Sequence, residues 1–122
     1  MACRHWVMPF DEALAGRVRR LLKRRRGVTE RRMFGGLCFL LNGNMCCGVE
    51  RGRLVVRTGP TQYERALKRP YARPMDFTGR PLKGFVYVDA RGCRSAAALK
   101  AWITLGADFA ASLPKKPKAH AA

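Results

Sequence analysis

The amino-acid sequence predicts an α+β fold, a two-layer antiparallel sheet packed with helices in the order α-β(3-4)-α-β(1-2)-α. Two observations lead to this fold class. Short apolar segments bounded by turn residues fill the middle of the chain, which is typical of the strands of a meander. Longer segments with apolar residues at helical spacing lie before, between and after them. Strands and helices of this kind bury their apolar faces against one another in layers.

The centre of the meander is the segment RMFGGLCFLLNGNMCCGV, residues 32–49. Its apolar run Leu37–Leu41 is too short for an independent helix and suits a pleated surface. Asn42-Gly43 predicts a tight hairpin turn, because both central residues of the favoured turn need a positive φ. Residues 45–49 then return as the partner strand, and Leu54–Arg57 form a third strand after a turn at residues 51–53.

The residues before this hairpin predict a further strand at Arg31–Phe34, with Gly35-Gly36 as a bulge or corner. The alternative is a helix over residues 33–41. That helix would contain two adjacent glycines, each costing about 1 kcal/mol relative to alanine. The antiparallel meander is therefore the favoured interpretation.

The first helix is predicted from Asp11, a suitable N-cap, to Arg26, with Gly27 just beyond its C-terminus. Its apolar stripe consists of Leu14, Val18, Leu21 and Leu22. A second helix is predicted to begin at Gly59-Pro60 and to stop before Pro70, with three residues facing inward: Tyr63, Ala66 and Leu67.

The last third of the chain is predicted to contain a loop, a strand and a helix. The loop covers Pro70–Lys83, and the strand Phe85–Val88 is expected to be buried on both faces. Ser95 caps the last helix. Its inward residues are Leu99, Trp102, Ile103, Gly106 and Ala110.

With 122 residues, of which 48% are hydrophobic, the chain is predicted to form one globular domain. The domain is expected to span residues 11–113, between an N-terminal tail at 1–10 and a basic, disordered tail at 114–122. No apolar run is long enough to span a bilayer, and the first ten residues lack the apolar core of a secretion signal. We expect a cytoplasmic protein.

Cysteine and histidine usage argues against a metal site, a cofactor or an enzyme. The five cysteines are an odd number without metal-ligand spacing, which predicts free thiols. Cys46 and Cys47 are neighbours, so we expect them to point to opposite faces of a strand. Cys38 and one of the pair are interpreted as small buried residues, and redox sensing by the outward one is the less favoured alternative. Both histidines lie in the tails, which removes the usual general base. Asp76 is interpreted as a carboxylate paired with Arg73 or Arg80.

The formal net charge of +17 points toward polyanions, nucleic acid first and an anionic membrane surface second. The alternative is a charged face that is only solvated. Basic side chains contact phosphates without reading sequence. The candidate nucleic-acid-binding residues are Arg17, Arg20, Lys23, Arg24, Arg25, Arg26, Lys115, Lys116 and Lys118.

Several segments of the chain together resemble one family. They are MFGG at 33–36, NGNMCCGV at 42–49, VRTGP at 56–60, RPMDFTGRP at 73–81, GFVYVD at 84–89 and Trp102. In this order they resemble the N-terminal domain of the TfoX/Sxy family of bacterial competence regulators, over roughly residues 11–113. The motif residues expected to be structural are Met33, Phe34, Gly35, Gly36, Asn42, Gly43, Gly48, Arg57, Asp76 and Gly79.

The resemblance implies a two-layer α/β fold of the secretion-chaperone-like type. It also implies a role in a transcription-regulatory system, although regulators with that role carry a second domain that would begin where this chain stops. The sequence therefore predicts a small non-enzymatic regulatory or adaptor protein that acts by protein–protein interaction. The alternative is a basic module that binds nucleic-acid phosphates. A homodimer is compatible with either function.

Overall fold

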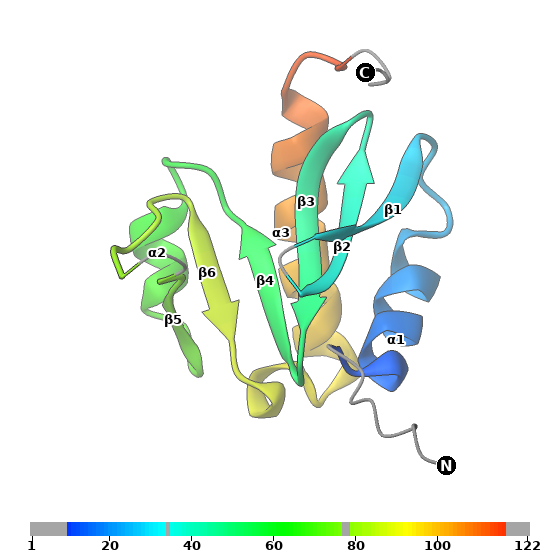
Figure 1. Ribbon diagram of the computed structural model, residues 1–122. Helices are drawn as coiled ribbons and strands as arrows, with labels where there is room; N and C mark the ends of the chain where they lie inside the picture. The colour runs from blue at the N-terminus through cyan, green and yellow to red at the C-terminus, as the bar shows by residue number, and fades with distance from the viewer. Residues whose placement is uncertain (1–9, 34, 77–78, 117–122) are drawn as a thin grey trace.

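The computed structural model describes residues 10–33, 35–76 and 79–116. Six strands form one antiparallel sheet in the order β1-β2-β3-β4-β6-β5 (Figure 1). The elements are α1 (Glu12–Leu22), β1 (Val28–Met33), β2 (Gly36–Leu41), β3 (Asn44–Glu50), β4 (Arg53–Arg57), α2 (Tyr63–Leu67), β5 (Ala72–Pro74), β6 (Phe85–Val88), η2, a short 3-10 helix (Ala90–Cys93), and α3 (Ala96–Ser112). The predicted α+β class and element order are confirmed.

The helices pack on one face of the sheet. Figure 1 views the sheet from the opposite face, with α3 behind β3 and β4. The main core lies between the layers and contains Leu14 and Val18 of α1, Ala66 of α2, and Trp102 and Ile103 of α3. In the described part of the chain no helix covers the other side, which we call the open face. One side of the sheet thus builds the core, and the other is available for contacts.

Both predicted caps are present. The Asp11 carboxylate accepts hydrogen bonds from the amides of Ala13 at 2.8 Å and Leu14 at 3.1 Å, and the Ser95 hydroxyl accepts from Ala98 at 3.0 Å. These side chains satisfy amide groups that a helix start leaves unpaired.

The predicted end of the first helix at Arg26 is wrong, because α1 stops at Leu22. Its last turn tightens, since the Arg25 amide donates to the Leu22 carbonyl three residues back, at 3.0 Å. Leu21 also departs from the predicted stripe, with 36% of its surface exposed. The second helix is shorter than predicted as well, beginning at Tyr63 rather than at Pro60.

The hairpin turn is as predicted, with positive φ at Asn42 (55°) and Gly43 (82°). The predicted loop at residues 70–83 is partly wrong, because Ala72–Pro74 form β5 and pair with β6. A three-residue strand that contains proline carries little sequence signal. Its position at the edge of the sheet is where proline is tolerated.

The prediction for the neighbouring cysteines is wrong. The pairing of β2 with β3 shifts by one residue, from Phe39–Cys47 to Leu40–Met45, which leaves Cys46 as the extra residue of a β-bulge. Cys46 and Cys47 are both fully buried in the main core, and their sulfur atoms lie 3.7 Å apart. The hydrogen bond between them and burial raise the pKa of the Cys47 thiol well above its usual value. No outward cysteine exists in this pair.

Helix α3 approaches β3 closely at Gly106. A β-carbon added at Gly106 would overlap the carbonyl oxygen of Cys46. Gly16 of α1 is different, because the nearest atom to an added β-carbon would be in the Arg20 side chain, at 3.9 Å. Packing therefore requires glycine at position 106, whereas it does not require glycine at position 16.

We expect Gly106→Ala to lower the free energy of unfolding by about 1–3 kcal/mol, because the extra methyl forces α3 away from the sheet. Gly16→Ala is the matched control. It should raise stability by about 0.5–1 kcal/mol, since alanine loses less backbone entropy in a helix. Urea unfolding of both variants checks this, and a neutral Gly106→Ala would contradict the close contact.

A second prediction concerns Cys93, which is 1% exposed in η2. Burial raises the pKa of its thiol to about 11 from the usual 9.0. The unfolded chain therefore loses this proton first, so the thiol's contribution to stability is complete below pH 9 and is lost as the pH rises to about 11. The free energy of unfolding should fall less steeply over this range in Cys93→Ala than in the wild type. Equal slopes in urea titrations would contradict it.

Candidate interaction surfaces

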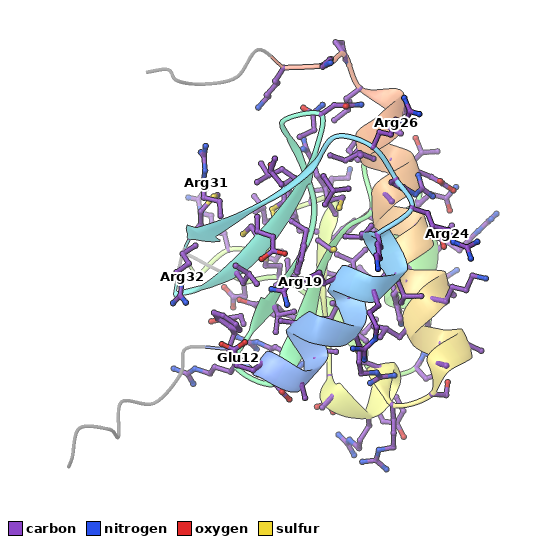
Figure 2. The ribbon with its side chains drawn as sticks, turned by 90° about the vertical axis from the view of Figure 1, so that its right-hand side faces the viewer. Glu12, Arg19, Arg24, Arg26, Arg31 and Arg32 are labelled. Atoms are coloured by element: carbon purple, nitrogen blue, oxygen red, sulfur yellow. The ribbon has the colours of Figure 1, made fainter. Side chains whose placement is uncertain are left out.

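The candidate nucleic-acid-binding residues of the first helix lie along α1 and in the turn after it. Arg20, Lys23, Arg24 and Arg26 are exposed. Figure 2 shows Arg24 and Arg26 at the C-terminal end of α1, on the other side of the helix from Arg31 and Arg32 of β1. Their charges therefore gather where the helix dipole is negative, which favours cations.

The C-terminal segment joins this group through Asn42. The Asn42 amide donates to the Gly27 carbonyl at 2.9 Å, and the Lys116 amide donates to the Asn42 carbonyl at 2.9 Å. The Asn44 side chain also donates to the Pro114 carbonyl at 3.0 Å. The structure thus brings residues 115–116, predicted as part of a trailing tail, next to the β2–β3 turn, which is itself bonded to the turn between α1 and β1. We call Lys23, Arg24, Arg26, Lys115 and Lys116 the basic end. Lys118 lies outside the described residues.

Two of the candidate arginines have partners within the protein. Arg25 forms an ion pair with Asp108 of α3 at 3.0 Å. Arg17 donates to the Arg94 carbonyl at 3.1 Å. Arg17 joins α1 to the residue before the N-cap of α3, and Arg25 joins the turn after α1 to α3 itself. These arginines therefore help to hold the helical layer together and are less available to phosphates.

Sequence reasoning did not single out Arg19, which makes two hydrogen bonds to Glu30 of β1. The Arg19 guanidinium lowers the pKa of this carboxyl. Beside the pair lies a cleft of about 470 Å³ between α1 and β1, lined by basic side chains that include Arg20 and Lys23. The pair joins the two walls of the cleft, and only the tertiary structure places it there.

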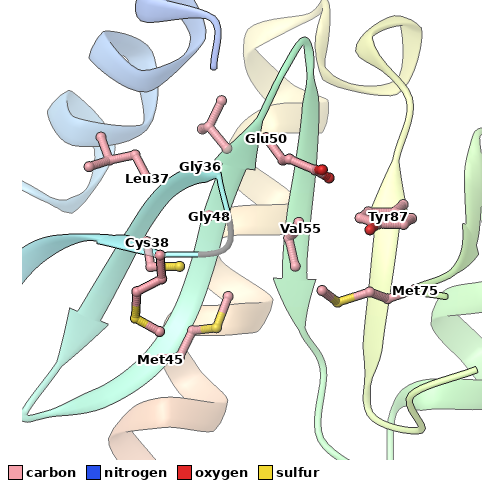
Figure 3. Close-up of a pocket in the computed structure, with 11 residues that line it drawn as sticks. Gly36, Leu37, Cys38, Met45, Gly48, Glu50, Val55, Met75 and Tyr87 are labelled. Atoms are coloured by element: carbon pink, nitrogen blue, oxygen red, sulfur yellow. The ribbon is translucent and has the colours of Figure 1, made fainter. Parts of the chain in front are cut away.

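The open face carries a second site, which sequence reasoning also missed. Its floor is formed by Cys38, Gly48 and Val55 of three adjacent strands. Figure 3 shows Met45 and Met75 on either side of Val55, reaching in from β3 and from the segment after β5. Together with Met33, Glu50 and Tyr87 these residues line an apolar hollow of about 30 Å³, which we call the methionine hollow.

The arginine at the rim of this hollow is held by two neighbours. Arg53 donates to the Glu50 carboxylate at 2.9 and 3.1 Å, and its guanidinium lies 3.5 Å from the centre of the Tyr87 ring. Burial raises the pKa of the Tyr87 hydroxyl. The rim is therefore ordered by one ion pair and one cation–π contact.

The residues of the family motif divide between turns and the methionine hollow. Met33, Gly36 and Gly48 line the hollow, while Gly35 (φ 76°) forms the corner between β1 and β2. Phe34 lies outside the described residues. Arg57 lies over the Phe85 and Phe109 rings, at 5.5 and 5.2 Å, and Gly79 has a φ of 86°. A sequence motif that was interpreted as structural thus also builds part of a site.

The interpretation of Asp76 as a paired carboxylate is wrong, because Asp76 is exposed and has no ion pair within the described ranges. Asp76 is exposed although its neighbour Met75 is buried, so its carboxylate lacks the buried setting of such a pair. Among residues 10–33, 35–76 and 79–116, no group of three or more His, Cys, Asp or Glu side chains is placed to hold a metal ion. None of the helices in the same ranges has the length and apolar character that a bilayer span requires.

Comparison with known proteins gives one result that bears on identity. No curated protein and no solved structure matches the chain significantly. The model of the TfoX N-terminal domain family matches residues 20–110, which is well over half of the chain and includes the methionine hollow. The chain belongs to the TfoX N-terminal domain family.

Proposed function

We propose that this protein is a small, non-enzymatic regulatory adaptor that acts by binding a protein partner of a transcription-regulatory system. Membership of the TfoX N-terminal domain family supports a competence-regulator-like role. The observation that carries the proposal is the open face, which no helix covers in the described part of the chain and which contains the methionine hollow. Methionine-rich apolar surfaces adapt to partner side chains because the thioether chain is flexible and polarisable.

Contact at the methionine hollow should depend on Met45, which is half-buried at its edge. We expect Met45→Asp to abolish most of the regulatory effect, because the few hot-spot residues near the centre of an interface each contribute about 2 kcal/mol or more and a buried carboxylate adds a desolvation cost. The measurement is the transcript profile of source cells that lack the gene and are complemented with each variant. A circular-dichroism melt of each purified protein verifies the fold.

The matched control is Lys100→Asp, which changes an exposed residue of α3 on the other layer. This variant should restore the wild-type profile. Full restoration by a folded Met45→Asp protein would overturn the proposed role of the open face.

A second candidate function is binding of nucleic-acid phosphates at the basic end. The hydrogen bonds of Asn42, which link Lys116 to the turn between α1 and β1, favour it. Basic groups gathered at one end can contact one stretch of backbone together, and each contact displaces counterions. Such binding would be independent of sequence.

We expect binding to random duplex DNA with a dissociation constant in about the micromolar range at low salt, weakening steeply between about 50 and 200 mM salt. The double variant Lys23→Glu/Arg24→Glu, which reverses two charges of the basic end, should abolish it. The control Arg31→Glu/Arg73→Glu changes the net charge equally at the two edges of the sheet and should retain most of the affinity. Affinity is measured by fluorescence anisotropy. An equal loss of DNA affinity in both variants would show that the DNA responds to net charge alone, and it would rule out a binding site at the basic end.

A further inference from the structure

The apolar residues at the centre of the open face are as buried as those of a core, although no helix among the described residues covers them. An antiparallel sheet with a solvated face usually presents polar side chains there. In this sheet Cys38 and Val55 are each 5% exposed, and Tyr87 is 7% exposed. Val55 and Tyr87 form a second apolar cluster with Met75, on the side away from the main core. An apolar centre of this kind fits contact with another molecule better than contact with water.

The strand register extends this centre into one row that crosses the whole sheet. Residues directly opposite one another on neighbouring strands have side chains on the same face. Successive cross-strand partners give the row Arg31–Cys38–Gly48–Val55–Tyr87–Arg73, one residue from each strand. Six strands place the two terminal arginines on the order of 24 Å apart, at about 4.8 Å per strand. The row is therefore apolar in the middle and positively charged at both edges.

The two terminal arginines have no carboxylate partner among the described residues. Both Arg31 and Arg73 are exposed, and neither takes part in an ion pair within the described ranges. Glu50, the carboxylate that lines the hollow, is already bonded to Arg53. Asp76 is exposed beside Met75, and Asp89 bonds to Arg91. Arg91 and, more weakly, Arg73 lower the pKa of the Asp89 carboxyl, so Arg73 lies within electrostatic reach of a carboxylate without an ion pair to it. The row thus offers two exposed arginines that have no ion-pair partner among the described residues.

We propose that the open face binds an acidic, amphipathic segment of the partner protein, with an aliphatic side chain in the methionine hollow and carboxylates at Arg31 and Arg73. This inference rests on the proposed adaptor function and specifies the chemistry of the partner. The hollow of about 30 Å³ admits only part of a leucine side chain, so the surrounding methionines rearrange when the anchor enters. The charge pairs set the orientation of the segment and speed its encounter.

The test uses a defined probe, a fluorescein-labelled peptide with one central leucine and glutamates on both sides. Binding is followed by anisotropy with the full chain and by NMR of ¹³C-methyl methionine. We expect the methyl signals of Met33, Met45 and Met75 to shift. A peptide with alanine in place of leucine, and one with lysines in place of glutamates, should each bind about tenfold more weakly or worse.

The variant Arg31→Glu/Arg73→Glu should bind the glutamate peptide about tenfold more weakly than the wild type, or worse. The matched control Arg20→Glu/Arg24→Glu makes the same charge change near α1 and should retain most of the affinity. Equal weakening by both, or binding without a shift of the three methyl signals, would overturn the inference. If the glutamate peptide does not bind the wild-type protein while transcript rescue still depends on Met45, the proposed adaptor function is retained. The proposal that the partner segment is acidic would then be overturned.

Discussion

Helix α3 lies directly on the middle of the sheet because Gly106 has no side chain to hold it away from the Cys46 carbonyl. This close approach brings Trp102 and Ile103 into the space between the layers, where both are 2% exposed. Helix α1 packs beside α3 and reaches the sheet through the same core. The position of α3 therefore depends on this backbone contact, and the described helices lie on one face of the sheet.

The bulge at Cys46 decides what the opposite face presents. Side chains alternate along a regular strand, so residues three apart point to opposite faces. The extra residue puts Met45 and Gly48 on the same face, while Cys46 and Cys47 both turn into the core. A one-residue change of register exchanges the two faces of a strand. Without the bulge, Met45 would turn toward α3, and the methionine hollow would lose one wall.

The hairpin turn and the helix caps could be predicted from the sequence, because the interactions that form them join residues close together in the chain. Asn42-Gly43 takes a positive φ readily, and Asp11 and Ser95 bond to amides within three residues. The end of α1 and the strand β5 depend on partners distant in sequence. Gly27 packs against Asn42, and within the sheet the three residues of β5 pair with β6. The open face could not be predicted either, because alternation shows that a strand has two sides and does not show which one the helices cover.

The residue types of both surfaces are visible in the sequence, but their roles follow from the fold. Arg25 belongs to the same basic run as Arg24, yet it is bonded to Asp108. With 25 basic and 8 acidic residues, the protein attracts any acidic molecule, so positive charge raises encounter rates and selects poorly among partners. Selectivity requires a contact that a wrong partner cannot make. On this protein that contact is the methionine hollow, because it is the apolar feature at the centre of a charged surface. A rigid polyanion such as duplex DNA has no flexible aliphatic side chain to insert there, whereas a protein segment does, and the hollow therefore favours a protein as the specific partner of the open face.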